Sequence, residues 1–201
     1  GTTRRAGAMG DIGCFSFFPS KNMAVGGEGG MLTTTRPDYQ DKIVGIIDHG
    51  RRPDLEAIQL GSNLRMSEVS ASIGLVQLSN LDAWIERRRQ NAALFTQTLA
   101  GHPTLQAPSV RPDSNHAWHQ YCIRTEDPAS FIAHFDSLGI DARQYYTIPC
   151  HQQHVYKLHS QYSQRLENTD MATTSLVAIP VMHELLDDEK QRIVAALRSY
   201  R

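Results

Sequence analysis

The residues best suited to chemistry lie around Lys21, which follows the short apolar run Cys14–Phe18. A lysine amine is a weak nucleophile at neutral pH because its ordinary pKa is about 10.4. Desolvation or a nearby cation lowers that pKa and makes imine formation with a carbonyl compound feasible. Apolar Phe15, Phe17 and Phe18 could supply such surroundings. The pattern therefore permits a Schiff-base lysine, although a lysine after a strand is ordinarily a surface residue.

Two further features near Lys21 suit an anionic ligand. The hydroxyl of Ser16 could donate to a phosphate oxygen, or it could simply bond to backbone within a strand. The glycine-rich stretch 26–30 would let the backbone approach a ligand closely, because glycine has no Cβ. Both features are compatible with a phosphate-bearing ligand, and spacing alone does not establish one.

The elements that would position Lys21 follow from the hydrophobic pattern. Cys14–Phe18 predicts a buried strand that ends at Pro19, because proline cannot donate to a sheet ladder. Met31–Thr35 is β-prone and follows the glycines, so we expect a hairpin or an adjacent strand pair. A helix should then run from Pro37 to His49-Gly50, where glycine can cap its end.

A long helical region should follow a loop over 51–62. Ser67 is the expected N-cap of this helix, and the apolar pattern continues from Glu68 towards Leu99. Glycine and prolines punctuate residues 101–115, which favours a domain boundary there. We therefore expect two domains, over residues 1–103 and 104–201.

The second domain should be a small α+β unit in which strands and helices follow one another. The expected strands are Trp118–Arg124, Ile140–Tyr146 and Ala178–Val181, and the expected helices are Pro128–Leu138, Met171–Val177 and Asp187–Tyr200.

Composition argues against several classes of function. Twenty basic side chains face 21 acidic ones, giving a net charge of −1, so no global charge favours nucleic acid or an anionic membrane. The basic run 87–89 is interpreted as a solvated helix face. Cys14, Cys122 and Cys150 are too few for a disulfide framework or a zinc site, and buried thiols in a reducing compartment are expected. No apolar run reaches the roughly 20 residues of a membrane span, and we expect a cytoplasmic protein.

Three histidines raise the question of a metal site. His116, His119 and His154 lack the i, i+4 spacing on a clear helix that would place two ligands on one face, so we expect no metal. Trp118 and Tyr121 nearby are interpreted as core residues rather than as platforms for stacking bases.

A series of short motifs runs in order along nearly the whole chain. They are Gly10–Asn22, Gly27–Met31, His49-Gly50-Arg51, Leu60–Met66, Leu81-Asp82 with Trp84, Arg87-Arg88, Trp118-His119 with Tyr121, Gly139–Arg143, and Tyr146 with Pro149 and His151. In this order they resemble the motifs of the DegT/DnrJ/EryC1/StrS aminotransferases, fold type I enzymes that aminate keto-sugar nucleotides. The resemblance implies an α/β fold, with the last part of a large cofactor domain over 1–103 and a small α+β domain over 104–201.

The resemblance also implies roles for individual residues. Lys21 would hold the implied cofactor, pyridoxal 5'-phosphate, as a Schiff base and then serve as acid and base in a proton shift. Ser16 resembles a phosphate-binding hydroxyl. Asn63 resembles the residue that reaches the cofactor phosphate of the neighbouring subunit in a homodimer. His151 and Tyr146 resemble residues near the sugar-nucleotide site.

Plainer interpretations stay open for three of these motif residues. Asn63 could be a turn residue in the left-handed conformation, which asparagine tolerates. Arg65 could pair with a carboxylate for structural reasons. His151 could be a surface histidine.

Some of the family's cofactor machinery has no counterpart in the sequence. The family's acidic residue for the pyridine nitrogen, which makes the ring an electron sink, would precede Gly1, as would the stacking aromatic residue and the first phosphate-binding loop. We therefore expect a C-terminal portion of a longer protein. Such a portion should expose an unpaired sheet edge and apolar surface, and should be marginally stable and inactive alone.

The implied reaction is the transfer of an amino group from an amino acid, glutamate in most of the family, to a keto-sugar nucleotide in a ping-pong cycle. One alternative is a pyridoxal-phosphate-dependent sugar dehydratase, but in that branch histidine replaces the lysine found here at position 21. Another is a non-catalytic or degenerate family member, against which the presence of Lys21, Ser16 and Asn63 argues.

Overall fold

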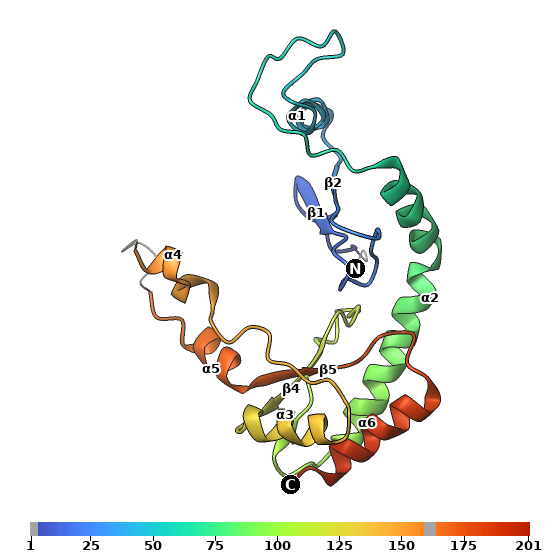
Figure 1. The fold of residues 1–201 in the computed structure, drawn as a ribbon, viewed down its shortest axis with the longest axis vertical. Coiled ribbons are helices and arrows are strands. Elements are labelled where there is room, and N and C mark those ends of the chain that lie inside the picture. Colours follow the sequence, from blue (N-terminus) through green and yellow to red (C-terminus); the bar gives the residue numbers. More distant parts are fainter. Residues whose placement is uncertain (1–3, 159–163) are drawn as a thin grey trace. The chain divides into compact units, whose positions relative to one another are not determined.

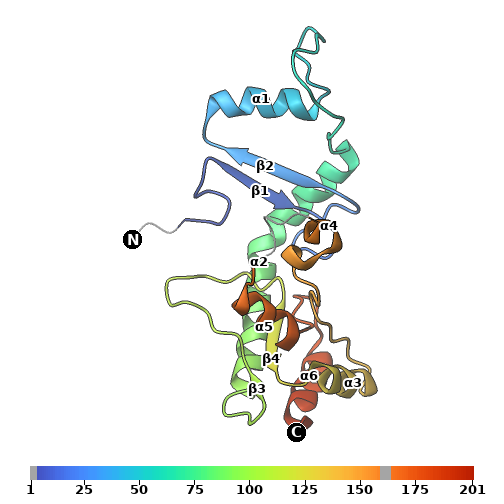
Figure 2. The same cartoon turned by 90° about the vertical axis from the view of Figure 1, so that its left-hand side faces the viewer.

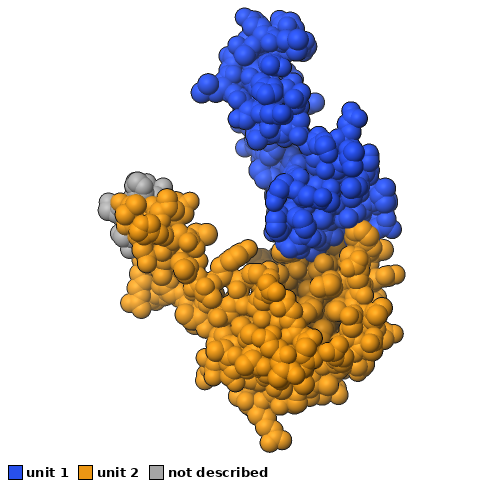
Figure 3. Space-filling view, in the orientation of Figure 1, with its two compact units in different colours: residues 1–82 blue, residues 83–201 orange. Residues whose placement is uncertain are grey.

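The computed structural model describes residues 4–158 and 164–201, and the chain is a mixture of helices and two small sheets. Its contacts divide it into two compact units, residues 1–82 and 83–201 (Figure 1, Figure 3). The division falls inside the long helix α2 (Glu68–Thr98). This division describes how contacts are distributed and does not define domains, so the expected domain boundary after residue 103 stays a prediction.

Unit 1 contains an antiparallel pair of strands, β1 (Ile12–Ser16) and β2 (Gly30–Thr34), followed by helix α1 (Pro37–Ile47) (Figure 2). The expected strand pair and helix are therefore confirmed, but the expected burial of the first strand was wrong, because Gly13 is the one residue of β1 that is buried. β1 ends at Ser16 rather than Phe18, because the Phe18 N–H donates to Ser16 Oγ at 3.3 Å and the chain turns away from the ladder.

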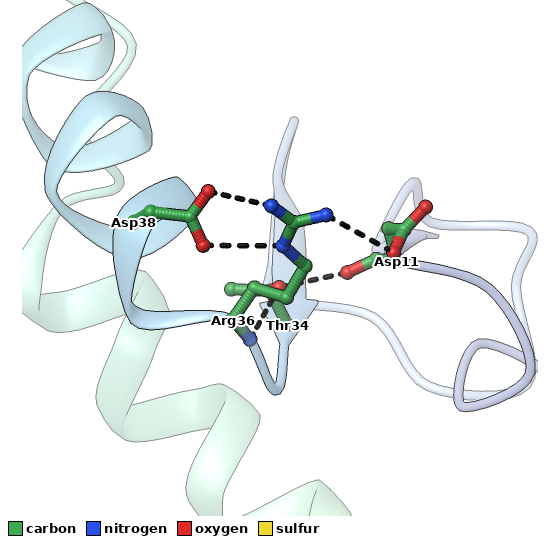
Figure 4. A network of polar contacts seen from close by, with 4 residues as sticks. All are labelled: Asp11, Thr34, Arg36 and Asp38. Atoms are coloured by element: carbon green, nitrogen blue, oxygen red, sulfur yellow. Dashed lines mark hydrogen bonds and ion pairs between the residues drawn. The ribbon is translucent and has the colours of Figure 1, made fainter.

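A polar network joins the end of β2 to the start of α1 (Figure 4). Arg36 donates twice to the Asp38 carboxylate, at 3.1 and 2.7 Å, and lies 3.7 Å from the Asp11 carboxylate. Thr34 Oγ1 donates to the Asp11 carbonyl and accepts the Arg36 N–H. The Arg36 guanidinium holds the pKa of Asp38 below its usual range. Because these groups are exposed to solvent, the network fixes the direction in which α1 leaves the sheet more than it stabilises the fold.

The loop that carries Lys21 packs on the first half of α2. Val25 in this loop is fully buried, and the Ala24 N–H donates to Gln77 Oε1 at 2.7 Å. A Cβ at Gly74 would lie 3.2 Å from Val25 Cγ1, so the absence of a side chain there lets the loop approach the helix. Glycine inside a helix costs about 1 kcal/mol relative to alanine, and this close packing gives the position a physical reason.

Unit 1 also has the unpaired edges and exposed apolar surface that were expected. Each strand of its sheet has one partner among the described residues. Apolar side chains of the two strands lie at the surface, and an open groove of about 500 Å³ runs between β1, β2, α1 and residues 64–66. The exposed strand residues are Ile12, Phe15, Met31 and Leu32.

Unit 2 holds the main hydrophobic core. Its antiparallel sheet has the order β3 (Leu105–Gln106), β4 (Tyr121–Thr125) and β5 (Leu176–Ile179). Among its described residues, the helices of this unit are the second half of α2, α3 (Pro128–Ser137), a single 3-10 turn η1 (Cys150–Gln152), α4 (His154–Lys157), α5 (Glu167–Ser175) and α6 (Asp187–Ser199). Trp118 and Tyr121 belong to the core, as predicted.

The expected strand Ile140–Tyr146 was wrong. Ile140 and Ala142 are buried in alternation, which gave the strand-like pattern, but the segment pairs with β5 at one point only. There Arg143 and Ala178 exchange two backbone hydrogen bonds of 3.0 and 2.8 Å. Side-chain packing thus reproduces the period of a strand without a ladder.

The interpretation of the basic run 87–89 as a solvated face was wrong for Arg88. Arg88 is buried and donates from Nη1 to the Trp118 carbonyl at 3.0 Å. Arg89 donates from Nε to the His116 carbonyl at 3.2 Å, while Arg87 is exposed. The run therefore fastens the 116–118 segment to α2, and Trp118 in that segment adopts a positive φ of 47°.

The cysteines are free thiols, but burial was expected and Cys14 and Cys150 are exposed. Cys122 is partly buried, and burial raises the pKa of its thiol. Among the described residues, no helix combines the length and the apolar character needed to cross a membrane. The same residues contain no cluster of three His, Cys, Asp or Glu side chains that could hold a metal ion.

A second contact with α2 involves His183. Its ring stacks on Trp84 with centroids 4.4 Å apart, and its side chain is 12% exposed. Burial lowers the pKa of His183, Arg88 and Arg87 lower it further, and Glu184 opposes the shift. The neutral ring is therefore the form that suits the folded protein.

Replacing Arg88 with alanine should lower the free energy of unfolding by about 1–3 kcal/mol, because it leaves the buried Trp118 carbonyl without its donor. The exposed Arg87→Ala is the matched control and should change it by less than about 0.5 kcal/mol. Urea unfolding followed by tryptophan fluorescence measures both. Equal losses would contradict the anchoring role of Arg88.

The lowered pKa of His183 predicts a pH-dependent stability. Because the unfolded chain binds this proton more tightly than the folded one, stability should be complete above about pH 6.5, the ordinary histidine pKa, and should fall as the pH decreases below it. Urea midpoints at several pH values measure the slope. His183→Gln should flatten it, and an unchanged slope in that variant would assign the effect to other groups.

Gly29→Ala should destabilise the protein by about 1–3 kcal/mol, since the added Cβ would lie 2.6 Å from Cγ2 of the fully buried Val25. At Gly27 an added Cβ meets nothing within 4 Å, so Gly27→Ala should change stability by less than about 0.5 kcal/mol. Thermal unfolding compares the two. If both variants unfold alike, Val25 does not anchor the Lys21 loop tightly.

Candidate active site

Lys21 is placed by a tight turn directly after β1. The Lys21 N–H donates to the Phe18 carbonyl at 2.9 Å, which closes a β-turn over residues 18–21. Pro19 occupies the second position of this turn, where its fixed φ is favoured. The side chain of Lys21 is half-buried. Within residues 4–82 its amine takes part in no ion pair, which leaves it available to a carbonyl compound.

Ser16 stands at the end of β1 and is exposed. Its Oγ accepts the Phe18 N–H at 3.3 Å, so the plainer interpretation of Ser16 as a residue bonded to backbone is partly realised. This contact uses the hydroxyl as an acceptor and leaves its proton for another partner. Ser16 can therefore still donate to a phosphate oxygen.

Asn63 lies near the end of the long loop that connects α1 to α2. It forms an isolated antiparallel bridge with Asp48. The alternative that placed Asn63 in the left-handed conformation was wrong, because the residues with positive φ in this loop are His49, Gly50 and Leu55. Arg65 donates from Nε to Asn63 Oδ1 at 3.1 Å, and its Nη1 lies 3.1 Å from Asp48 Oδ1. Arg65 thus pairs with a carboxylate, as the structural alternative held.

The backbone segments around Gly50 and Gly61 of this loop lie in close contact. A Cβ on Gly50 would lie 1.8 Å from the Gln59 carbonyl oxygen, and one on Gly61 would lie 2.1 Å from the Gly50 nitrogen. Only glycine fits at both positions, and Gly50 also has a φ of 74°. The two glycines thereby bring the chain back beside α1 in the register that pairs Asp48 with Asn63.

The predicted substrate residues, His151 and Tyr146, lie in unit 2. His151 belongs to the 3-10 turn η1, and its side chain is 15% exposed, so the surface alternative was wrong. His151 Nε2 lies 3.6 Å from Asp170 Oδ1, which also accepts a hydrogen bond of 2.7 Å from Gln152. Tyr146 is 73% exposed. Their assignment to a sugar-nucleotide site stays a prediction.

Sequence reasoning missed three residues that position the candidate site. Asp48 and Gln77 act through contacts between distant segments, for which local pattern carries no signal. Gly74 did carry one, since an isolated glycine within a helical pattern calls for a packing reason. Its neighbour in the structure is Val25 of the Lys21 loop.

Three side chains of unit 1 carry groups of the kinds that a phosphate-bearing aldehyde could bind. Lys21 offers an amine for the carbonyl group. Ser16 offers an O–H and Asn63 an N–H₂, and both are exposed hydrogen-bond donors of the kind that phosphate oxygens accept. Ser16 ends β1, and Asn63 lies on a segment whose backbone is hydrogen-bonded to Ile47 and His49 at the end of α1.

Comparison with known proteins identifies a family to which the chain is similar over nearly its whole length. The model of the DegT/DnrJ/EryC1/StrS aminotransferase family matches residues 1–198. The chain is 29% identical over 197 residues to dTDP-3-amino-3,4,6-trideoxy-alpha-D-glucose transaminase of Streptomyces venezuelae, covering 98% of this chain and 52% of that protein. It is 31% identical over 192 residues to UDP-N-acetyl-3-dehydro-alpha-D-glucosamine 3-aminotransferase of Acidithiobacillus ferrooxidans, covering 96% and 51%. The chain therefore spans about half the length of these relatives.

Solved structures show the same likeness. S. venezuelae DesV in complex with a ketimine intermediate matches with a TM-score of 0.92 and 30% identity, over 97% of this chain and 53% of that one. NtdA from Bacillus subtilis with bound cofactor PMP matches with a TM-score of 0.83 and 25% identity, over 93% and 45%. Because the family model covers nearly every residue, the chain belongs to the DegT/DnrJ/EryC1/StrS family of pyridoxal-phosphate-dependent aminotransferases.

Proposed function

We propose that the protein, at the full length of its relatives, transfers an amino group from an amino acid, glutamate, to a keto-sugar nucleotide. The observation that carries this proposal is the placement of Lys21, a half-buried amine on a proline turn in a loop fixed to α2. The names of the relatives support the class of acceptor, since two of them are transaminases of dTDP- and UDP-linked sugars.

The roles of the chain's own residues follow from their chemistry. Bound pyridoxal phosphate supplies an electron sink for carbanion chemistry. Lys21 would hold this cofactor through its side-chain amine and would move a proton at that nitrogen. The Ser16 hydroxyl donates to the phosphate. The Asn63 amide donates to the phosphate bound by a neighbouring subunit, so a homodimer with shared sites is part of the proposal.

The lysine at position 21 favours amino transfer over sugar dehydration, because histidine takes that place in the dehydratase branch of the family. His151 and Tyr146 are proposed to contact the sugar nucleotide from unit 2. His151 suits this role because its Nε2 is buried and has no hydrogen bond within the described residues. A cytoplasmic location also belongs to this proposal, since nucleotide sugars are its substrates.

Borohydride reduction in the presence of pyridoxal phosphate should attach the cofactor covalently to Lys21, as mapped by mass spectrometry of peptides. Lys42 is an exposed lysine of α1 and serves as the internal control for non-specific labelling. In a protein of the full length of its relatives, Lys21→Ala should lose the label and the glutamate-dependent amination of a keto-sugar nucleotide. Equal labelling of Lys21 and Lys42, or full label in Lys21→Ala, would refute the proposal.

A further inference from the structure

We propose that Arg65 and Asp48 are positioning residues, which hold the Asn63 side chain with its NH₂ group turned outward to bind the cofactor phosphate. This inference rests on the proposed function, in which Asn63 binds a phosphate. It adds two residues that act through Asn63, and it is carried by the contacts among three side chains of unit 1.

The contact with Arg65 sets the direction of the Asn63 amide. A side-chain amide has an accepting end, Oδ1, and a donating end, Nδ2. A guanidinium has donors only, so the end of Asn63 that faces Arg65 Nε at 3.1 Å must be Oδ1. Nδ2 then points away from Arg65. Asn63 is exposed, so this donor is open to a ligand.

A phosphate can be bound only when the Nδ2 end of the Asn63 amide faces it. Phosphate oxygens accept hydrogen bonds, and at neutral pH an amide can bind them only through Nδ2. A free asparagine rotates its amide readily, and half of its orientations would turn Oδ1 towards the anion. Fixing the amide before the ligand arrives removes that loss, which is the general benefit of preorganisation.

Asp48 pairs with the guanidinium of Arg65. Its carboxylate lies 3.1 Å from Arg65 Nη1, at a distance that makes an ion pair although the two groups are not aligned as a hydrogen bond. The backbone keeps this carboxylate next to Asn63, because the His49 N–H donates to the Ser62 carbonyl and the Leu64 N–H to the Ile47 carbonyl. Asp48 thereby keeps the guanidinium beside Asn63, where Arg65 Nε reaches Oδ1.

Asp48 also argues against direct binding of the phosphate by Arg65. Its negative charge lies against the guanidinium and would oppose an anion at that group. Both side chains are partly exposed, at 53% for Arg65 and 34% for Asp48, so the ion pair by itself contributes little stability. Orientation of Asn63 is the function that the arrangement serves.

The first experiment needs no cofactor. In protein labelled with ¹⁵N at asparagine, the heteronuclear NOE of the Asn63 Nδ2H₂ group should show an ordered amide. Arg65→Ala and Asp48→Asn should each make it mobile. Arg52→Ala removes a neighbouring exposed arginine whose ion pair with Glu56 is 3.6 Å long, and it should leave Asn63 ordered. An amide equally mobile in wild type and Arg65→Ala overturns the inference, whether or not the protein binds pyridoxal phosphate.

The second experiment is a double-mutant cycle on the dissociation constant of pyridoxal phosphate, measured by fluorescence titration of the protein. Arg65→Ala and Asn63→Ala should each weaken binding about five- to tenfold, and the double variant should be no weaker than Asn63→Ala alone. Binding of pyridoxal, which lacks the phosphate, should be unchanged in all three variants.

The outcomes separate the inference from the proposed function. If Arg65→Ala weakens binding as much in the Asn63→Ala background as in the wild type, Arg65 contacts the ligand directly and the inference fails while the function stands. If the wild type takes up no cofactor, the function fails and the NMR experiment still decides whether Arg65 orders Asn63. Should Arg65→Ala not fold, Asp48→Asn supplies the same comparison, because it preserves the shape of the side chain.

Discussion

The close approach of the Lys21 loop to α2 is the constraint on which the candidate site depends. Val25 is fully buried and packs on α2 at Gly74, which has no side chain. Gln77 Oε1 accepts a hydrogen bond from the adjacent Ala24 N–H. A reactive amine on a glycine-rich loop would otherwise sample many orientations. Catalysis is faster when reacting groups are held in position before the substrate binds. Here contacts with α2 hold the loop, and Pro19 favours the turn that precedes Lys21.

The same helix secures loops in unit 2 by different means. Arg88, Arg89 and Asn91 donate to backbone carbonyls of the 116–118 segment and of Met182. Buried carbonyl groups outside a helix or sheet need donors of this kind. A single element thus positions segments along its length, because Gly74 and Gln77 hold the Lys21 loop while Arg88 and Asn91 bind backbone carbonyls in unit 2.

Much of the fold could be predicted from local pattern, and the failures have specific causes. Proline, glycine and serine marked the limits of α1 and α2 within a few residues, because capping and backbone restriction are local effects. The strand expected at 140–146 was wrong because alternating burial does not require a ladder partner. Arg88 was assigned to solvent because charge normally avoids the interior, and only the crossing of the 116–118 segment gives it a reason to be buried.

The sequence by itself determined which chemical groups the candidate site offers, since a lysine, a serine and an asparagine occur in motifs ordered as in one enzyme family. The tertiary structure decided how those groups are presented. It showed Lys21 in a loop anchored by Gly74 and Gln77, and it paired Asn63 with Asp48 and Arg65. The physical reason is that residue type and order are properties of the chain, whereas contacts between segments far apart in sequence exist only once packing has brought those segments together.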